Sequence, residues 1–454
     1  MKGIFMNTEN KMGVMPIKQL IITMSLPMMI SMLVQALYNV VDSIFVARIS
    51  ENALTAVTLA FPMQNLMIAL GSGTGVGINA LLSRSLGEKK FETSDGAANT
   101  GLLLTFFNYL IFLIIGIFFA GSFIATQTSN SEITSLGSSY LTIICCLSFG
   151  VFFQITFERL LQSTGKTFFS MISQVSGAVI NIIFDPLLIF GIGPFPELGV
   201  AGAAYATIFG QVIASFIGLF CNLKYNTDIK LDIKRVLHPD AYIVKSIYYV
   251  GIPSILMMSI GSIMTYLMNL ILGTFSSTAT AVFGVYFKLQ SFFFMPVFGL
   301  NNGLIPVLAY NYGARRKDRI KEALQFALIL AVTIMVAGTI CFITIPGTLL
   351  SFFNASDEMI KIGSPALRII SLSFPLAGCC IAMGSIFQAF SKSIYSLIIS
   401  VGRQLVVLIP AAYLLAQTGV LSNVWFAFPI AEMVSLVLST LFFKKLYKST
   451  VSTM

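Results

Sequence analysis

Charged side chains are scarce in this 454-residue sequence. Asp, Glu, Lys and Arg make up 10% of it, whereas an average soluble domain carries roughly 25%. The single histidine, His238, lies beside Pro239 in a polar stretch, where a solvated turn is the simplest interpretation. With one histidine, no HExxH pattern and no Walker-type lysine, the sequence argues against zinc enzymes, catalytic triads and ATP-driven proteins. We therefore expect neither enzymatic activity nor a bound cofactor.

Disulfide and zinc signatures are also missing. The cysteines lie in or at the ends of apolar runs, and their spacing matches neither a disulfide framework nor a zinc site. Free cysteine is commonly a buried packing residue. We expect that role for all six: Cys145, Cys146, Cys221, Cys341, Cys379 and Cys380.

Long apolar runs, in contrast, dominate the chain. Hydrophobic residues make up 56% of it, and the mean hydropathy is +0.89. A membrane span needs about 20 apolar residues, and it must be helical because the bilayer core offers the backbone no water. The sequence predicts an all-α polytopic membrane protein with twelve spans, at about 17–45, 53–83, 97–121, 133–160, 168–191, 199–223, 247–272, 280–310, 323–346, 360–390, 394–416 and 423–443.

The six-span pattern occurs twice, 226 residues apart. Leu26-Pro27 returns as Ile252-Pro253, and Leu86-Gly87 followed by two lysines returns as Tyr312-Gly313 followed by two arginines. A constant offset over most of a half indicates a duplication. Paired membrane halves are typical of secondary transporters, in which the substrate path runs between them. We expect lobes at 1–223 and 247–454, joined by a linker at 224–246, which is either an interfacial amphipathic helix or a polar loop.

Basic residues are distributed unevenly across the expected loops. Alternate assignment of the loops to two sides puts 21 of the 27 Lys and Arg on the side that holds both termini and the linker. The positive-inside rule then places that side in the cytoplasm. Because each half has six spans, the halves share an orientation and are related by a pseudo-two-fold axis along the membrane normal. This distribution suits a plasma-membrane protein, and we expect no nucleic-acid partner and a monomeric chain.

Alternate glycines, at Gly71, Gly73, Gly75 and Gly77, form two overlapping GxxxG pairs inside an apolar run. No strand precedes them, so a phosphate-binding loop is the weaker interpretation. They predict close helix packing.

Polar residues inside the spans gather in the first half. Gln35, Tyr38, Asn39 and Asp42 share one helix face. Asn181 and Asp185 share a face of the fifth span, and Thr207 lies on the sixth. Asp42, Asn181, Asp185 and Thr207 should meet in one leaflet. Their oxygen ligands suit Na⁺ or a shared proton.

The second half lacks this set. The repeat positions are Gly261, Met264, Thr265 and Met268, then Val407 and Ala411, and Ala427 where a shorter loop reduces the offset to 220. A packing role should have been kept in both halves, so the asymmetry favours a functional cation site. The alternative is an interhelical hydrogen-bond cluster.

Several segments resemble the multidrug and toxic compound extrusion (MATE) family, and most closely its MepA-like bacterial branch. They are QALYNVVD at 35–42, the stretch from Gly71 to Gly87, NIIFDP at 181–186 and GVAGAA at 199–204. The resemblance covers nearly the whole chain. It implies antiport of H⁺ or Na⁺ against organic, usually cationic, drugs or toxins. It also implies cation binding at Asp42, Asn181, Asp185 and Thr207, and bending of the first helix at Pro27.

The sequence departs from relatives that use acidic residues on the seventh and tenth spans. Its seventh span has no acid, and its tenth carries Arg368. Among the other charged residues of the second half, Arg403 and Glu432 are expected to pair. Lys288 and Arg368 are expected to snorkel. None is assigned to substrate.

Three other functions remain open at this point. A lipid or lipid-linked oligosaccharide flippase of the same superfamily would have more helices and a strongly cationic cavity. An intramembrane enzyme would need a nucleophile with a base or a metal set. A receptor would not need the duplication.

Overall fold

The computed structural model describes residues 10–353 and 355–454. The N-terminal tail with Lys2, counted above among the cytoplasmic basic residues, lies outside them. Every element in the described part is a helix. The first half contains α1 (Lys11–Val14), α2 (Ile17–Ala47), α3 (Glu51–Gly87), α4 (Phe91–Phe118), α5 (Ala120–Ala125), α6 (Ser131–Cys146), α7 (Phe149–Ser163), α8 (Thr167–Ile189), α9 (Val200–Tyr225) and α10 (Ile233–Val236).

The second half repeats this order. It contains α11 (Ala241–Gly273), α12 (Ser277–Gly313), α13 (Lys317–Thr344), α14 (Pro346–Ser351), α15 (Asp357–Ser371), α16 (Phe374–Ala389), α17 (Ser393–Val401), the π-helix η1 (Gly402–Leu408), α18 (Ile409–Ala416), α19 (Leu421–Val424), α20 (Ala427–Leu446) and the π-helix η2 (Tyr447–Val451).

The duplication is visible in the helix ends. α3, α4 and α5 begin and end 226 residues before α12, α13 and α14. The caps repeat too, because the Ser50 side chain accepts a hydrogen bond from the Ala53 N–H and Ser276 does the same for Ala279. Left-handed residues recur at the same offset, as Lys89 with Arg315 and Gly165 with Ser391. The two halves therefore share helix caps and turn conformations as well as the hydropathy pattern.

The twelve predicted spans are confirmed. Ten helices of the described chain are long and apolar enough to cross a membrane. Two further spans are bent pairs, α6 with α7 at 45° and α15 with α16 at 46°. In the sequence each pair is one continuous apolar run, because neither break lies in a polar segment.

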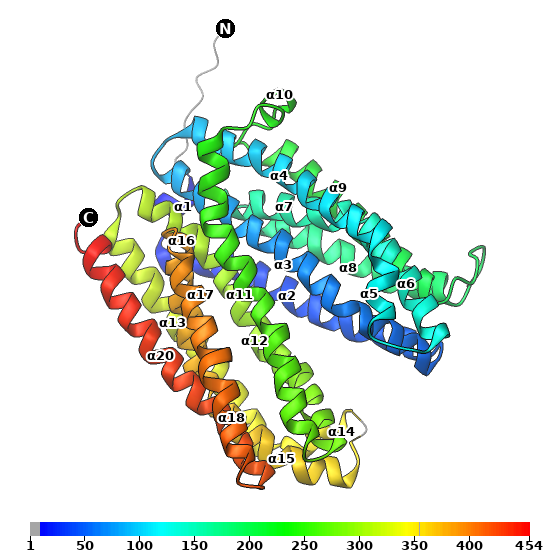
Figure 1. The fold of residues 1–454 in the computed structure, drawn as a ribbon. Coiled ribbons are helices and arrows are strands. Elements are labelled where there is room, and N and C mark those ends of the chain that lie inside the picture. Colours follow the sequence, from blue (N-terminus) through cyan, green and yellow to red (C-terminus); the bar gives the residue numbers. More distant parts are fainter. Residues whose placement is uncertain (1–9, 354) are drawn as a thin grey trace.

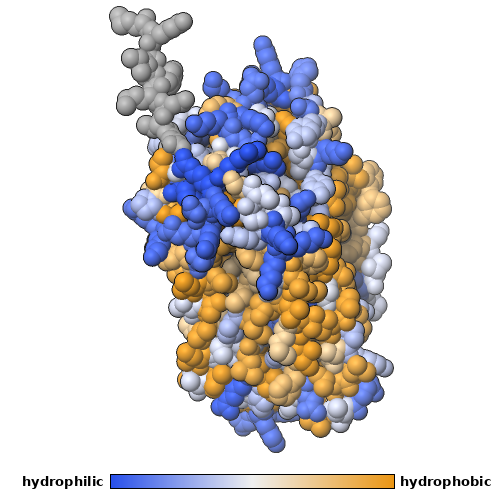
Figure 2. Space-filling view, turned by 90° about the vertical axis from the view of Figure 1, so that its left-hand side faces the viewer, coloured by the Kyte–Doolittle hydropathy of each residue, from blue (hydrophilic) through white to orange (hydrophobic). Residues whose placement is uncertain are grey.

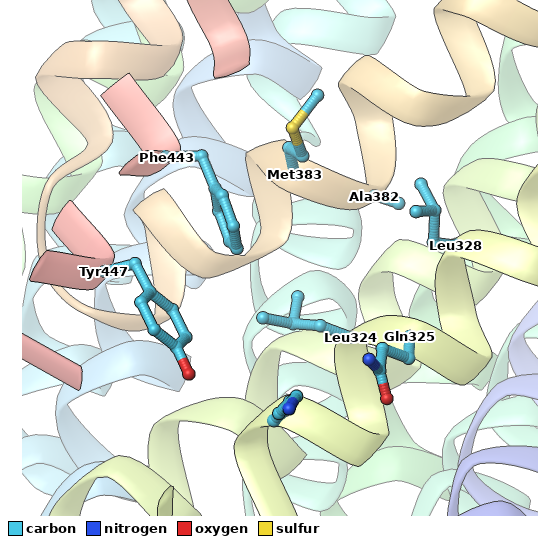
Figure 3. A pocket seen from close by; sticks show the side chains of 8 residues that line it. Leu324, Gln325, Leu328, Ala382, Met383, Phe443 and Tyr447 are labelled. Carbon is cyan, nitrogen blue, oxygen red and sulfur yellow. The ribbon is translucent and has the colours of Figure 1, made fainter. Parts of the chain in front are cut away.

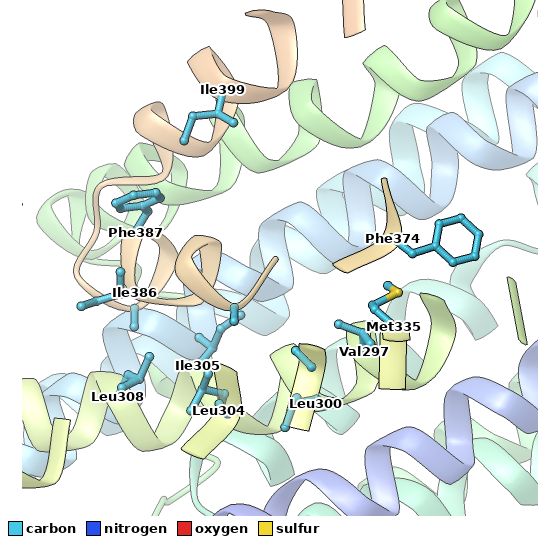
Figure 4. Close-up of a cluster of buried hydrophobic side chains, with 14 of the residues drawn as sticks. Val297, Leu300, Leu304, Ile305, Leu308, Met335, Phe374, Ile386, Phe387 and Ile399 are labelled. Carbon is cyan, nitrogen blue, oxygen red and sulfur yellow. The ribbon is translucent and has the colours of Figure 1, made fainter. Parts of the chain in front are cut away.

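The α helices form two bundles that meet near the chain termini and spread apart at their other ends (Figure 1). Within the C-terminal bundle, apolar side chains from α12, α13, α16 and α17 interdigitate (Figure 4). On the face that carries α13 and α20, a wide apolar band lies below a polar cap close to the N-terminal end (Figure 2). This pattern matches a bilayer-embedded body with one strongly polar end.

Glycines bring the two bundles into contact, as the GxxxG pairs predicted. A Cβ at Gly77 of α3 would overlap the Ile247 carbonyl group of α11, and one at Gly73 would overlap Ile255. The repeat partners Gly299 and Gly303 of α12 approach α2 equally closely. These contacts lie in the half of α3 and α12 nearer the termini, so the bundles are closed at that end.

The overlapping pair, Gly71 and Gly75, has another partner. It packs within the N-terminal bundle, against Phe152 and Arg159 of α7.

The N-terminal segment bridges both bundles at this closed end. The Asn10 side chain donates to the Thr164 carbonyl group at 3.0 Å. From the other bundle, Asn311 donates to the Met12 carbonyl group at 3.1 Å, and Arg319 donates to the Met15 carbonyl group at 2.8 Å. Met12 itself is fully buried. Residues 10–15 therefore cross the seam between the two bundles.

The connection between the bundles is mostly irregular. Between α9 and α11, only α10 is helical, and Ile233 and Leu237 at its ends are exposed. The polar-loop alternative therefore describes this segment better than a long amphipathic helix.

Candidate functional site

The polar residues predicted in the first half converge inside the N-terminal bundle. Asn181 and Asp185 lie one turn apart on α8, and Thr207 lies near the start of α9. The Asn181 amide donates to Asp185 Oδ1 at 3.3 Å and to Thr207 Oγ1 at 3.2 Å. Asp185 is fully buried, and Asn181 is 3% exposed. One amide thus ties the two helices together at the carboxylate.

Asp42 reaches the same cluster from α2. Its carboxyl group and that of Asp185 lie within electrostatic range of each other. Both residues are near the ends of their helices that face away from the termini. The predicted meeting of Asp42, Asn181, Asp185 and Thr207 is therefore present in the structure.

Three buried oxygens of this cluster have no hydrogen-bond partner within the described residues: Asp42 Oδ1, Asn181 Oδ1 and Asp185 Oδ2. An acceptor that is buried without a donor costs free energy, and the cost is larger when it is ionised. A proton shared by the two carboxyl groups or a small hard cation would remove that cost. The oxygen-only donor set fits Na⁺ and not a transition metal.

Of the three supporting residues on α2, two interact with groups inside the bundle and one is exposed. Tyr38 lies within electrostatic range of both carboxyl groups. The Gln35 side chain accepts a hydrogen bond from Gln174 of α8 at 2.9 Å, one layer nearer the termini. Asn39 is exposed, and in the described structure its side chain forms no hydrogen bond with the cluster. The predicted polar face is thus narrower than the helical spacing indicated, because Asn39 points off the bundle interior.

Two further polar side chains border the cluster and were missed in the sequence. Tyr140 of α6 is 2% exposed, lies within electrostatic range of Asp42, and accepts a hydrogen bond from Gln64 of α3 at 3.2 Å. Gln211, one turn after Thr207 on α9, has a buried oxygen without a partner among the described groups. The spacing of Thr207 and Gln211 was a signal that could have found the second residue.

The corresponding region of the C-terminal bundle is apolar. Met264 and Met268 are 8% and 0% exposed and belong to the hydrophobic core, and Ala427 is fully buried. The asymmetry read from the sequence is therefore an asymmetry of the folded interior.

Other charged residues of the spans lie away from this cluster. Arg403 and Glu432 form the expected ion pair, on η1 and α20. Lys288 and Arg368 are exposed, and Arg368 donates to the Ile343 carbonyl group at 3.2 Å. The sequence did not predict the setting of Arg159, which is 8% exposed and donates to Gln162 and, across the seam between the bundles, to Asn302 of α12 at 3.1 Å.

Comparison with known proteins decides the family. The family model MatE matches residues 27–187 and again residues 253–414, so it finds both halves of the duplication. The chain belongs to the MatE family. One similar relative is the multidrug export protein MepA of Staphylococcus haemolyticus (strain JCSC1435), which is 26% identical over 412 residues, covering 90% of this chain and 89% of the relative.

Solved structures of MATE transporters share the whole fold. A multidrug resistance MATE family transporter of the MOP superfamily in its outward-facing conformation superposes with a TM-score of 0.92, at 26% identity over 98% of this chain and 99% of that one. A MATE in the bent conformation gives a TM-score of 0.89 over 96% and 97% of the two chains, at 26% identity. These relatives are transporters, and the comparisons do not favour the flippase alternative.

Proposed function

We propose that this MatE family member exports amphipathic, cationic organic compounds in exchange for H⁺ or Na⁺. Export of drugs is what its relatives are named for. The observation that carries the coupling is the acidic pair in one lobe of the duplicated transporter fold. Asp185 is fully buried, and the buried oxygens Asp42 Oδ1 and Asp185 Oδ2 have no hydrogen-bond partner among the described residues. A cation is the missing counterpart of that pair.

The route for alternating access follows from the lobe contacts. The seam is closed by glycines at the end with the termini, and the bundles spread at the other end (Figure 1). We place the termini and residues 224–246 in the cytoplasm of a bacterial cell, with the lobes at 1–223 and 247–454 rocking about this seam. The chain would act as a monomer, and Pro27 within the continuous helix α2 would be where that helix bends.

The entry of one proton supplies enough free energy to drive the export of a drug against its gradient. A single charge that crosses 100 mV yields about 2.3 kcal/mol, and a tenfold proton gradient adds about 1.4 kcal/mol. Together they support a drug concentration ratio of several hundred.

Transport by the purified protein in vesicles is the test. A fluorescent organic cation is loaded, and a proton gradient and a sodium gradient are imposed separately, with protein-free vesicles as the control. We expect drug movement against its gradient under at least one of the two. Correctly folded, inserted protein that moves no cationic or neutral drug under either gradient would refute the proposal.

A further inference from the structure

The two lobes differ in a groove at the end that carries the termini. In the N-terminal lobe, the groove beside α4 is filled by the chain itself. Asp95 accepts a hydrogen bond from the Lys230 N–H at 2.7 Å, and Asn99 donates to the Lys230 carbonyl group at 2.8 Å. The adjacent Ile229 is 6% exposed and joins the hydrophobic core. A short peptide segment thus occupies this groove.

In the C-terminal lobe, the equivalent groove holds a cavity of about 330 Å³ between α13, α16 and α20 (Figure 3). Its volume falls within the usual range of ligand pockets, about 300–1,000 Å³. The repeat partners of Asp95 and Asn99 are Lys321 and Gln325, and both line the cavity. The remaining lining is largely apolar: Leu324, Leu328, Ala382, Met383, Phe443 and Tyr447.

The N-terminal lobe has the acidic Asp95 where the C-terminal lobe has the basic Lys321, so the charge in the groove is opposite in the two lobes. A carboxylate there receives a peptide N–H, whereas an ammonium group attracts an anion. In the described residues, no acidic side chain pairs with Lys321. Lys321 is the basic residue of the lining, so the cavity carries a positive charge at that end.

The groove is polar at one end only. Beyond Leu328, towards the middle of the apolar band, Ile329 is 63% exposed, and on α20 Leu441 is 58% exposed. Figure 1 places α13 and α20 at the outer side of the C-terminal lobe, and Figure 2 shows that face as an apolar band below a polar cap. A ligand here would touch apolar side chains along its length and Lys321 at its head.

We propose that this groove binds an anionic phospholipid of the leaflet on the side of the termini. The phosphate lies at Lys321, with the Gln325 amide and the Tyr447 hydroxyl as further donors, and one acyl chain runs along Leu324, Leu328 and Phe443 in the cavity. Basic pockets between helices at this depth are suited to anionic head groups. A cationic drug would be repelled by Lys321. The inference does not depend on the transport function.

Photo-crosslinking in vesicles tests the proposal. The full chain is reconstituted in phosphatidylcholine vesicles that contain a trace of either phosphatidylglycerol or phosphatidylcholine with a photoreactive acyl chain, and labelled peptides are mapped. We expect phosphatidylglycerol to label residues 321–328 and 443–447 in preference to phosphatidylcholine. Lys321→Gln should lower that preference about fivefold, because one basic residue near an anionic surface contributes about 1 kcal/mol.

Two further variants separate charge from cavity. Lys234→Gln, at an exposed lysine of α10 at the same end of the molecule, should leave the preference unchanged. Ala382→Leu, which fills the cavity, should reduce labelling of the groove by both lipids. Equal labelling by the two lipids, or a preference that survives Lys321→Gln, would overturn the proposal. Lys321 is exposed, so its variant reports on the head group whether or not the core variant folds.

Discussion

At the residue scale, the N-terminal lobe has an acidic pair that the C-terminal lobe lacks at the equivalent positions. Asp185 is fully buried, and Asp42 approaches it from another helix. Two neighbouring carboxylates in a low-dielectric interior cannot easily both be ionised without a cation. One bound proton or one bound Na⁺ would remove one of the two negative charges, and we expect the two cations to compete for the same oxygens. In our proposal, Asn181 and Thr207 would supply neutral oxygens for Na⁺.

The first prediction is therefore competition between the two cations. Addition of Na⁺ to purified protein in weak buffer should release about one proton per chain, because the pair titrates as a unit. Asp42→Asn should abolish the release, and Asp318→Asn, at an exposed acid of α13, should not. Independent proof of Na⁺ binding without proton release between mildly acidic and neutral pH would show that the cations do not compete.

At the element scale, the helices are joined by close backbone contacts that large residues would prevent. A Cβ at Gly77 would overlap the carbonyl group of Ile247, a backbone atom that cannot rotate away. The same geometry is found at Gly299 and Gly303, so the seam is built twice from one pattern.

We predict that Gly77→Ala destabilises the closed end by about 1–3 kcal/mol, the usual cost of overpacking. The matched control is Gly284→Ala in α12, where nothing lies within 4 Å of the new methyl group. The control should be neutral or stabilising by about 0.5–1 kcal/mol, because alanine favours a helix over glycine. Thermal unfolding in detergent compares the two variants, and equal melting temperatures would mean that the seam tolerates side chains.

Much of the element pattern was predictable, because hydropathy and the repeat both survive in the sequence. The helix breaks at Leu147-Ser148 and Leu372-Ser373 could not be predicted, because they fall inside apolar runs. The π-helix η1 was also missed. It precedes Pro410, which has no N–H to bond the Val406 carbonyl group, and the sequence shows the proline but not how the backbone adapts.

Which side chains lie near one another was predictable where helical spacing was enough. Asp42, Asn181, Asp185 and Thr207 could be grouped from spacing, depth and the asymmetry between halves. Tyr140 and the contact of Arg159 with Asn302 depend on how separate helices pack, which spacing along one helix does not encode. Asn39 shares the predicted face but is exposed, because the rotation of α2 against its neighbours is set by tertiary contacts.

At the scale of the whole molecule, orientation follows from charge. Alternate assignment of the loops puts 21 of the 27 Lys and Arg on the side of the termini and the linker. We predict that a cysteine at the exposed Lys230, in a chain without its native cysteines, is not labelled in intact cells by an impermeant thiol reagent. A cysteine at the exposed Ser129, which lies in a loop at the opposite end, is the positive control. Labelling of the first position and not the second would invert the topology.

One measurement tests the coupling of the acidic pair to drug export most directly: gradient-driven export from vesicles by matched variants. Asp42→Asn and Asp185→Asn keep the size of each side chain but remove the charge that a cation neutralises. Each should abolish or severely reduce movement of a fluorescent organic cation under the gradient that drives the wild type, while Asp318→Asn transports normally. Full transport by both site variants, at equal insertion, would contradict the account and leave the cluster as an interhelical hydrogen-bond network.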